Sequence, residues 1–195
     1  MIPKLIKLGV QTILKIICEN IIIKNIQIIN KNDKFNGTID EIYIKAEKII
    51  FNKINISKIN FRIRNVDLKS ALNNKKFSID NCNAVMHIKL TKDNINKTLF
   101  NKKWKRLKTS IESFVSMNFK SIEINNQSIC FISSDTLTNK NIDYNLQYNQ
   151  NSISLVNNIN KEKLSILNDK NIIVNNLFFC ENFIELELSS KIILN

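Results

Sequence analysis

Two stretches of alternating apolar residues between Thr38 and Leu68 constrain the fold of this chain more than any other feature. An alternation of period two predicts β-strands with one buried face, and Gly37 predicts a turn before the first strand. The apolar phase slips by one residue at Ser57-Lys58, which would move every later side chain to the other face, so we expect a bulge that bends the sheet there. A long, bent sheet with one apolar face predicts a surface that wraps something apolar. The alternating residues are Ile39, Ile42, Ile44 and Ala46 in the first strand, and Ile54, Ile56, Ile59, Phe61 and Ile63 in the second.

The segment Met1–Asn20 predicts an amphipathic helix. Its polar residues Lys4, Lys7, Gln11 and Lys15 recur at steps of three and four and line one face, opposite a broad apolar face. They interrupt the run of about 20 apolar residues that a membrane span needs, and the unbroken apolar core of a signal peptide is missing too. We expect this helix to pack on the sheet, and we leave open that it also lies on a membrane surface. The expected location is therefore cytoplasmic or peripheral to a membrane.

The rest of the chain predicts mainly strands, with two further helices and no linker rich in serine or proline. Thr91 is a typical N-cap, followed by a helix with Ile95 and Leu99 on one side. A short helical turn is expected at Leu68–Leu72. Residues 1–195 are expected to form a single domain of the α+β class. The further expected strands are Ile21–Ile29, Val85–Leu90, Phe119–Asn125, Ser128–Ser134, Ile142–Gln147, Ile153–Asn157, Ile172–Phe179 and Phe183–Ser190.

The second of these helices, Asn101–Met117, combines a narrow apolar stripe with a cluster of positive charge. Lys102, Lys103, Lys105 and Arg106 surround Trp104 in the sequence. Either the helix docks by its stripe and its charges are simply solvated, or the cluster faces an anionic membrane, where each cation contributes roughly 1 kcal/mol. We take these five residues as the membrane-facing candidates.

The composition argues against an enzyme. With Gly 2 and His 1, the chain cannot supply a glycine-rich phosphate loop, a dinucleotide fingerprint or a nucleophile elbow. His87 is expected to be structural, and Glu185 and Glu187 are expected on the wet face of a strand. The four cysteines have no zinc-type spacing and are expected as buried, reduced thiols. We therefore predict no catalytic residues, no metal and no cofactor.

The net charge of +12 has two explanations that the sequence leaves open. An anionic partner, either nucleic acid or a membrane, would select for it. Drift in an AT-rich genome would also produce it, because such drift favours Lys, Ile and Asn. Nucleic acid is the weaker candidate, since aromatic residues are only 8% and no stacking strand or recognition helix is evident.

Four segments follow one another in a characteristic order: Gly37-Thr38-Ile39, the phase-shifted strand Ile54–Phe61, the strand and helix start Asn83–Asn96, and the C-terminal strand Ile184–Leu188. Their order and spacing resemble the LmeA-like phospholipid-binding proteins of actinobacteria and cyanobacteria. The resemblance spans nearly the whole chain. It implies a tubular-lipid-binding (TULIP-like) fold, in which a curved antiparallel sheet wraps a long helix and an apolar cavity takes acyl chains.

The sequence thus predicts a non-enzymatic protein that binds phospholipid or another apolar lipid in a curved-sheet cavity and associates with anionic membranes. An acyl chain needs no sequence motif, because each buried CH₂ contributes roughly 0.8 kcal/mol. The alternatives are a protein-interaction module without lipid and a basic nucleic-acid-binding protein. The lipid-binding candidates are Ile6, Val10, Ile13, Ile17, Ile42, Ile44, Ile59 and Phe61.

Overall fold

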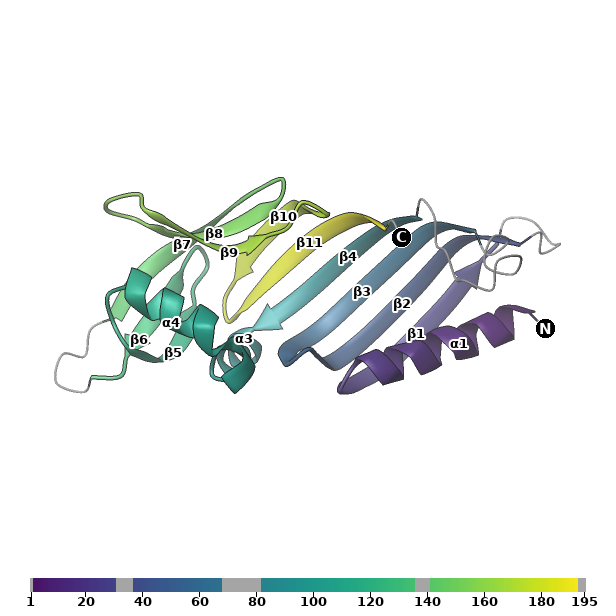
Figure 1. The fold of residues 1–195 in the computed structure, drawn as a ribbon, viewed down its shortest axis with the longest axis horizontal. Coiled ribbons are helices and arrows are strands. Elements are labelled where there is room, and N and C mark those ends of the chain that lie inside the picture. The colour runs from purple at the N-terminus through teal and green to yellow at the C-terminus, as the bar shows by residue number, and fades with distance from the viewer. Residues whose placement is uncertain (1, 31–36, 68–81, 136–140, 193–195) are drawn as a thin grey trace.

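The protein is an α+β structure with an N-terminal helix and a curled antiparallel sheet (Figure 1). This computed structural model describes residues 2–30, 37–67, 82–135 and 141–192. The expected helical turn at Leu68–Leu72 lies outside these ranges. The helices are α1 (Ile2–Ile17), α3 (Lys92–Leu99), the 3₁₀ helix η1 (Lys102–Trp104) and α4 (Lys105–Phe114). The strands are β1 (Asn20–Ile29), β2 (Thr38–Phe51), β3 (Ile54–Asp67), β4 (Cys82–Thr91), β5 (Phe119–Ile124), β6 (Ile129–Ser133), β7 (Asn141–Asn149), β8 (Ser152–Asn157), β9 (Lys163–Asn168), β10 (Ile172–Cys180) and β11 (Phe183–Ile192).

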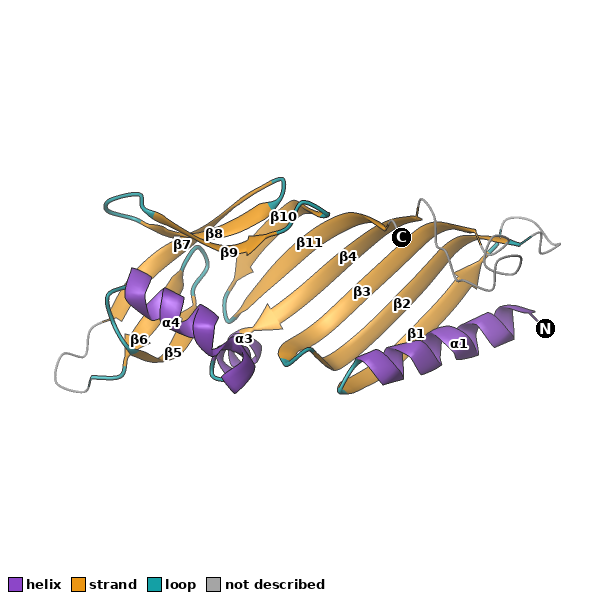
Figure 2. Cartoon of the chain, in the orientation of Figure 1, coloured by secondary structure: helices purple, strands orange, loops and turns teal. Residues whose placement is uncertain are grey.

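The strands form two antiparallel sheets (Figure 2). The larger has the order β1-β2-β3-β4-β11-β10, and the smaller has the order β5-β6-β7-β8-β9. The C-terminal hairpin β10–β11 completes the larger sheet by pairing β11 with β4, so the smaller sheet is an insertion between β4 and β10. In Figure 1, α1 lies at the β1 end of the larger sheet and the smaller sheet lies at the β10 end.

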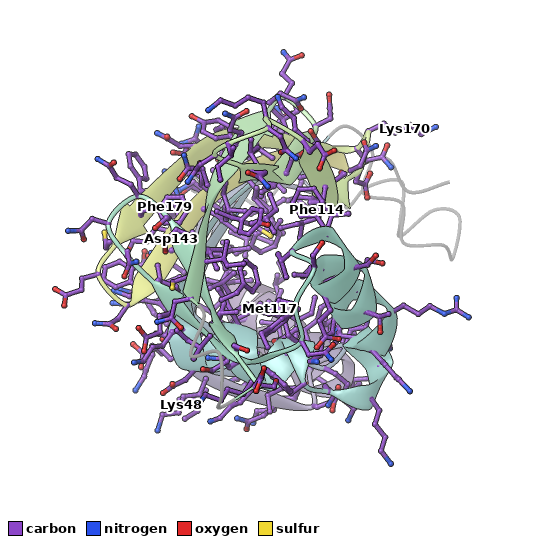
Figure 3. All side chains as sticks on the ribbon, turned by 90° about the vertical axis from the view of Figure 1, so that its left-hand side faces the viewer. Lys48, Phe114, Met117, Asp143, Lys170 and Phe179 are labelled. Carbon is purple, nitrogen blue, oxygen red and sulfur yellow. The ribbon has the colours of Figure 1, made fainter. Side chains whose placement is uncertain are left out.

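The larger sheet is amphipathic across all six strands. Residues opposite each other in antiparallel strands point to the same face, so the register defines rows of side chains. One row joins Ile26, Ile44, Phe61, Met86, Leu188 and Val174, and the next joins Ile23, Ala46, Ile59, Ile88, Leu186 and Leu177. The rows on the other face are mostly polar, such as Lys45, Asn60, His87 and Glu187. Figure 3 agrees, because mostly carbon fills the interior and nitrogen- and oxygen-bearing ends point outward.

The bulge predicted in β3 at Ser57-Lys58 is wrong, although the phase slip behind it is real. β3 pairs with β2 and with β4 in constant register. Both strands change face together: Ala46 and Ile59 are opposite each other, and so are Ile49 and Ile56 beyond the slip. Between them Lys48 of β2 has a left-handed φ of 51°. The local distortion therefore lies in the neighbouring strand β2, whose pairing with β1 also shifts register near Lys48.

The turns around β2 follow from residues that tolerate positive φ. Gly37 has a left-handed φ of 92°, which favours glycine, and the chain bends there just before β2. The two-residue turn Asn52-Lys53 joins β2 to β3 with φ of 52° and 65°. Positive φ at both positions suits the right-handed twist of a hairpin.

Helix α1 packs on the apolar face of the larger sheet, as predicted. Ile6, Val10 and Leu14 recur at helical spacing and contact a buried cluster that includes Ile26, Ile39, Ile42, Ile44 and Val66. The helix therefore covers the apolar face of β1 and β2 and leaves most of the middle strands β3 and β4 uncovered by α1.

The helices between the sheets confirm one prediction and correct another. Thr91 caps α3: its hydroxyl accepts from the Asn94 amide at 3.3 Å, and its own amide donates to Asn94 Oδ1 at 3.1 Å. The single helix expected over Asn101–Met117 is wrong, because Asn101 caps η1 first and α4 then runs only to Phe114. Ser116 has φ of 51°, so the chain leaves the helix there. Strand β9 was not predicted, since Lys163–Asn168 is short and half-polar.

Candidate functional site

An apolar cavity of about 180 Å³ lies where helices α3 and α4 meet both sheets. Its walls include Leu99 and Ile111 from the helices, Ile122 and Phe131 from the smaller sheet and Leu186 from the larger one. The polar residues in the lining are Asn55 and Thr98. The Asn55 backbone amide donates to the Thr98 hydroxyl at 2.9 Å, and this hydroxyl donates to the Asn94 carbonyl at 2.8 Å. An apolar cavity of about 150 Å³ stays dry and can hold benzene. This cavity therefore has room for about six carbon atoms.

The middle of the larger sheet extends this apolar surface beyond the cavity. We call Ile59, Phe61, Met86 and Ile88 the apolar floor. All four are half-buried. The ends of the first row, Ile26 and Val174, are buried, whereas the ends of the second row, Ile23 and Leu177, are half-buried. Ile88 lies opposite Leu186, which lines the cavity. An apolar path therefore runs from the floor into the cavity.

The predicted lipid-binding residues lie at the floor and at the α1 end, and none of them lines the cavity. Ile42 and Ile44 are buried beneath α1, while Ile59 and Phe61 belong to the floor. Ile6 and Val10 pack against the sheet, but Ile13 and Ile17 are exposed on α1. Sequence reasoning missed the cavity because its walls come from many separate elements, each contributing one to three side chains.

The predicted membrane-facing residues form one exposed cluster on η1 and the start of α4. Lys102, Lys103, Lys105 and Arg106 are exposed, whereas Trp104 is half-buried. The Trp104 indole donates from Nε1 to the Asn52 carbonyl at 3.3 Å, and the Lys103 ammonium donates to the Asn52 side chain. The tryptophan thus helps to hold the β2–β3 turn.

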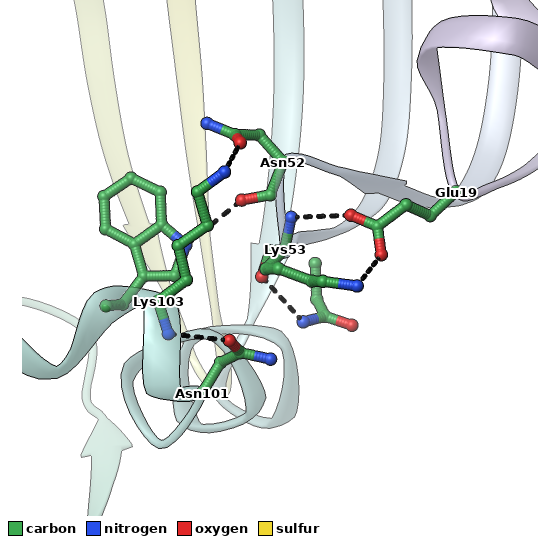
Figure 4. A network of polar contacts seen from close by, with 7 residues as sticks. Glu19, Asn52, Lys53, Asn101 and Lys103 are labelled. Atoms are coloured by element: carbon green, nitrogen blue, oxygen red, sulfur yellow. Dashed lines mark hydrogen bonds and ion pairs between the residues drawn. The ribbon is translucent and has the colours of Figure 1, made fainter.

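The same turn also holds the end of helix α1 (Figure 4). The Lys53 amide donates to Glu19 Oε1 at 3.0 Å, and the Lys53 ammonium pairs with the other oxygen. The hydrogen bond from the Lys53 side chain is the main reason that the pKa of the Glu19 carboxyl group is lowered. The end of α1, the β2–β3 turn and the basic cluster are therefore neighbours in space.

The polar face of the larger sheet carries paired charges around a hollow of about 540 Å³. Glu41 accepts from Arg62 at 3.2 Å and from Arg64 at 3.0 Å, and Lys89 lies 3.8 Å from Glu185. Glu185 and Glu187 share this face, as predicted, and His87 is exposed on it. Acidic partners therefore pair with Arg62, Arg64 and Lys89 on this face.

The cysteines differ from the prediction of four buried thiols. None of the four forms a disulfide, but only Cys82 and Cys130 are buried, and Cys18 and Cys180 are half-buried. Burial and the nearby Asp143 raise the pKa of Cys130 to about 11, so its thiol stays protonated at neutral pH.

Within the described ranges, no three His, Cys, Asp or Glu side chains lie close enough together to hold a metal ion. In the same ranges, no helix has both the length and the apolar character needed to cross a membrane.

No family model matches the chain, and searches of curated proteins and of solved structures return no match either.

Proposed function

We propose that this protein binds a phospholipid or another apolar lipid without catalysis, in the manner of a TULIP-like protein. The main observation in support is that the floor adjoins the cavity, because Ile88 of the floor lies opposite Leu186 of the cavity wall. One acyl chain places its end in the cavity and its remaining length along Ile88, Met86, Ile59 and Phe61. The headgroup stays outside the cavity and beyond the apolar floor, in contact with water.

The volume of the cavity supports placing only the end of the acyl chain inside it. Space for about six carbons corresponds to roughly 5 kcal/mol of burial, at roughly 0.8 kcal/mol for each CH₂. That gain is of the same order as the free energy that association itself costs. The contacts along the floor are therefore needed for stable binding, so a long acyl chain should bind better than a short one.

Native mass spectrometry of the purified protein tests the proposal. We expect adducts with the masses of lipids, which organic extraction removes and added long-chain lipid restores. Long-chain lipid should compete for the site better than a six-carbon analogue. A protein that carries no lipid and takes up none would contradict lipid binding, and it would favour the protein-interaction alternative.

The same proposal includes weak association with anionic membranes through the basic cluster. Replacing Lys102, Lys103, Lys105 and Arg106 together by Gln should weaken binding to anionic vesicles at least tenfold at low salt. The reason is Coulombic, because each cation contributes roughly 1 kcal/mol near such a surface. The difference should shrink as salt rises, since the Debye length is then a few ångströms. Vesicle co-sedimentation measures both effects.

A matched variant separates the position of the charge from its amount. Lys120, Lys161, Lys163 and Lys170 are exposed on or beside the smaller sheet. Replacing these four by Gln removes the same charge elsewhere and should weaken binding much less. Equal losses in the two variants would mean that only the net charge matters and that the cluster is not a docking face.

A further inference from the structure

Helix α1 carries large apolar side chains on the side that does not touch the sheet. Leu5, Leu8, Ile13, Ile16 and Ile17 are 61%, 60%, 59%, 76% and 51% exposed. At about 3.6 residues per turn, Leu5, Leu8 and Ile16 lie on the side of α1 away from Val10, and Ile13 lies at the flank. Ile17 lies on the same side as Val10 but is exposed near the end of the helix. We call these five residues the α1 strip. No other helix or strand in the described ranges has as many large hydrophobic side chains exposed.

The charges of α1 indicate what covers the strip. Lys4, Lys7 and Lys15 are exposed along the helix, and α1 contains no Asp or Glu. An apolar strip with lysines along one edge and no acidic residue is typical of helices that lie in the interface of an anionic bilayer. An ordinary protein surface rarely leaves so continuous an apolar face in water.

The position of α1 agrees with this partner. Its far end is bonded to the β2–β3 turn, which also holds Lys103 and Trp104 of the basic cluster (Figure 4). Its inner face shares a packed cluster with Phe61 of the apolar floor. A bilayer that covers the strip would therefore lie next to both the basic cluster and the floor.

We propose that α1 docks the protein on an anionic bilayer, with the α1 strip among the acyl chains and its lysines among the headgroups. This inference deepens the proposed function, because it identifies a bilayer contact next to the floor as the route by which lipid enters. It differs from docking through the basic cluster alone, since apolar insertion persists when salt screens the charges.

Two triple variants test the inference in co-sedimentation with phosphatidylcholine vesicles with and without phosphatidylglycerol. Replacing Leu5, Leu8 and Ile16 by Gln should weaken binding to the anionic vesicles at least tenfold, at low and at high salt. The control replaces three apolar residues that are exposed on other elements, Ile159, Ile173 and Phe178, by Gln. The control should bind like the parent. Circular dichroism verifies that both variants fold.

A fluorescent reporter locates the inserted surface directly. In a Trp104→Phe background, the indole introduced by Leu8→Trp should be quenched by brominated lipid in anionic vesicles. The indole introduced by Ile159→Trp in the same background should not be. Equal quenching of the two, or unchanged binding of the α1 variant, would overturn the inference. So would a parent dimer that the α1 variant converts to a monomer, because a second copy would then cover the strip.

Native mass spectrometry keeps this inference separate from the proposed function. The α1 variant should still carry added lipid, because none of its three substitutions touches the floor or the cavity. Docking without any bound lipid would defeat the proposed function and leave the docking surface intact. Bound lipid without docking would do the reverse.

Discussion

Filling the cavity with larger side chains should abolish lipid binding while the protein stays folded. Ile95 of α3 and Leu146 of β7 both line the cavity and are half-buried. Replacing both by Phe places their rings in the space that we assign to the end of the acyl chain. Losing even part of roughly 5 kcal/mol of burial weakens binding by more than tenfold. We expect the lipid adducts in native mass spectra to fall by at least that factor.

The control for this variant adds the same bulk outside the cavity. Ile173 is exposed on β10, so Ile173→Phe should leave the lipid adducts unchanged. The melting temperature of the double variant should stay close to that of the parent or rise, because the rings occupy empty apolar space. A double variant that is stably folded and carries as much lipid as the parent would show that the acyl chain lies elsewhere.

Removing the Asn96 side chain should strongly lower the stability of the protein. From α3, Asn96 donates to the Ile122 carbonyl at 3.0 Å and accepts from the Ile122 amide at 2.8 Å. Ile122 is 2% exposed and lies in β5, an edge strand of the smaller sheet. Asn96→Ala leaves both backbone groups without this partner, so we expect a loss of about 2 to 4 kcal/mol. Urea denaturation measures it.

Two further variants on the same helix separate the hydrogen bonds from other effects. Asn96→Asp keeps an acceptor for the Ile122 amide but loses the donor, so its loss should be smaller than that of Asn96→Ala. Lys97 is exposed, and Lys97→Ala should change stability by less than about 0.5 kcal/mol. If Asn96→Ala costs no more than Lys97→Ala, water replaces the side chain at this edge and the pairing is not structural.

Most of the local structure of this chain was predictable from its sequence. Alternation placed β2 and β3, helical spacing placed α1, and Thr91 marked the start of α3. These signals are local, because side chains two, three or four positions apart define a face without reference to the rest of the chain. The same reasoning failed at Ser57-Lys58, where the neighbouring strand took up the phase slip through Lys48.

The candidate site was predictable only in part. Ile59 and Phe61 of the floor followed from strand periodicity, and Ile6 and Val10 followed from helix periodicity. The periodic pattern also marked Ile13 and Ile17 as apolar, but it could not say that they remain exposed. An apolar face indicates that a side chain will pack against something apolar, but it does not identify what covers that side chain.

The cavity was decided by tertiary structure alone. The sequence by itself determined an α+β chain with amphipathic strands, a basic surface and no glycine-rich phosphate loop. The pairing of β4 with β11 joins segments about a hundred residues apart and places the inserted smaller sheet against the larger one. Only this long-range closure brings Leu99, Ile122 and Leu186 around one space. Each of these residues is an ordinary core residue in its own element, so no local pattern distinguishes a cavity wall from a filled core.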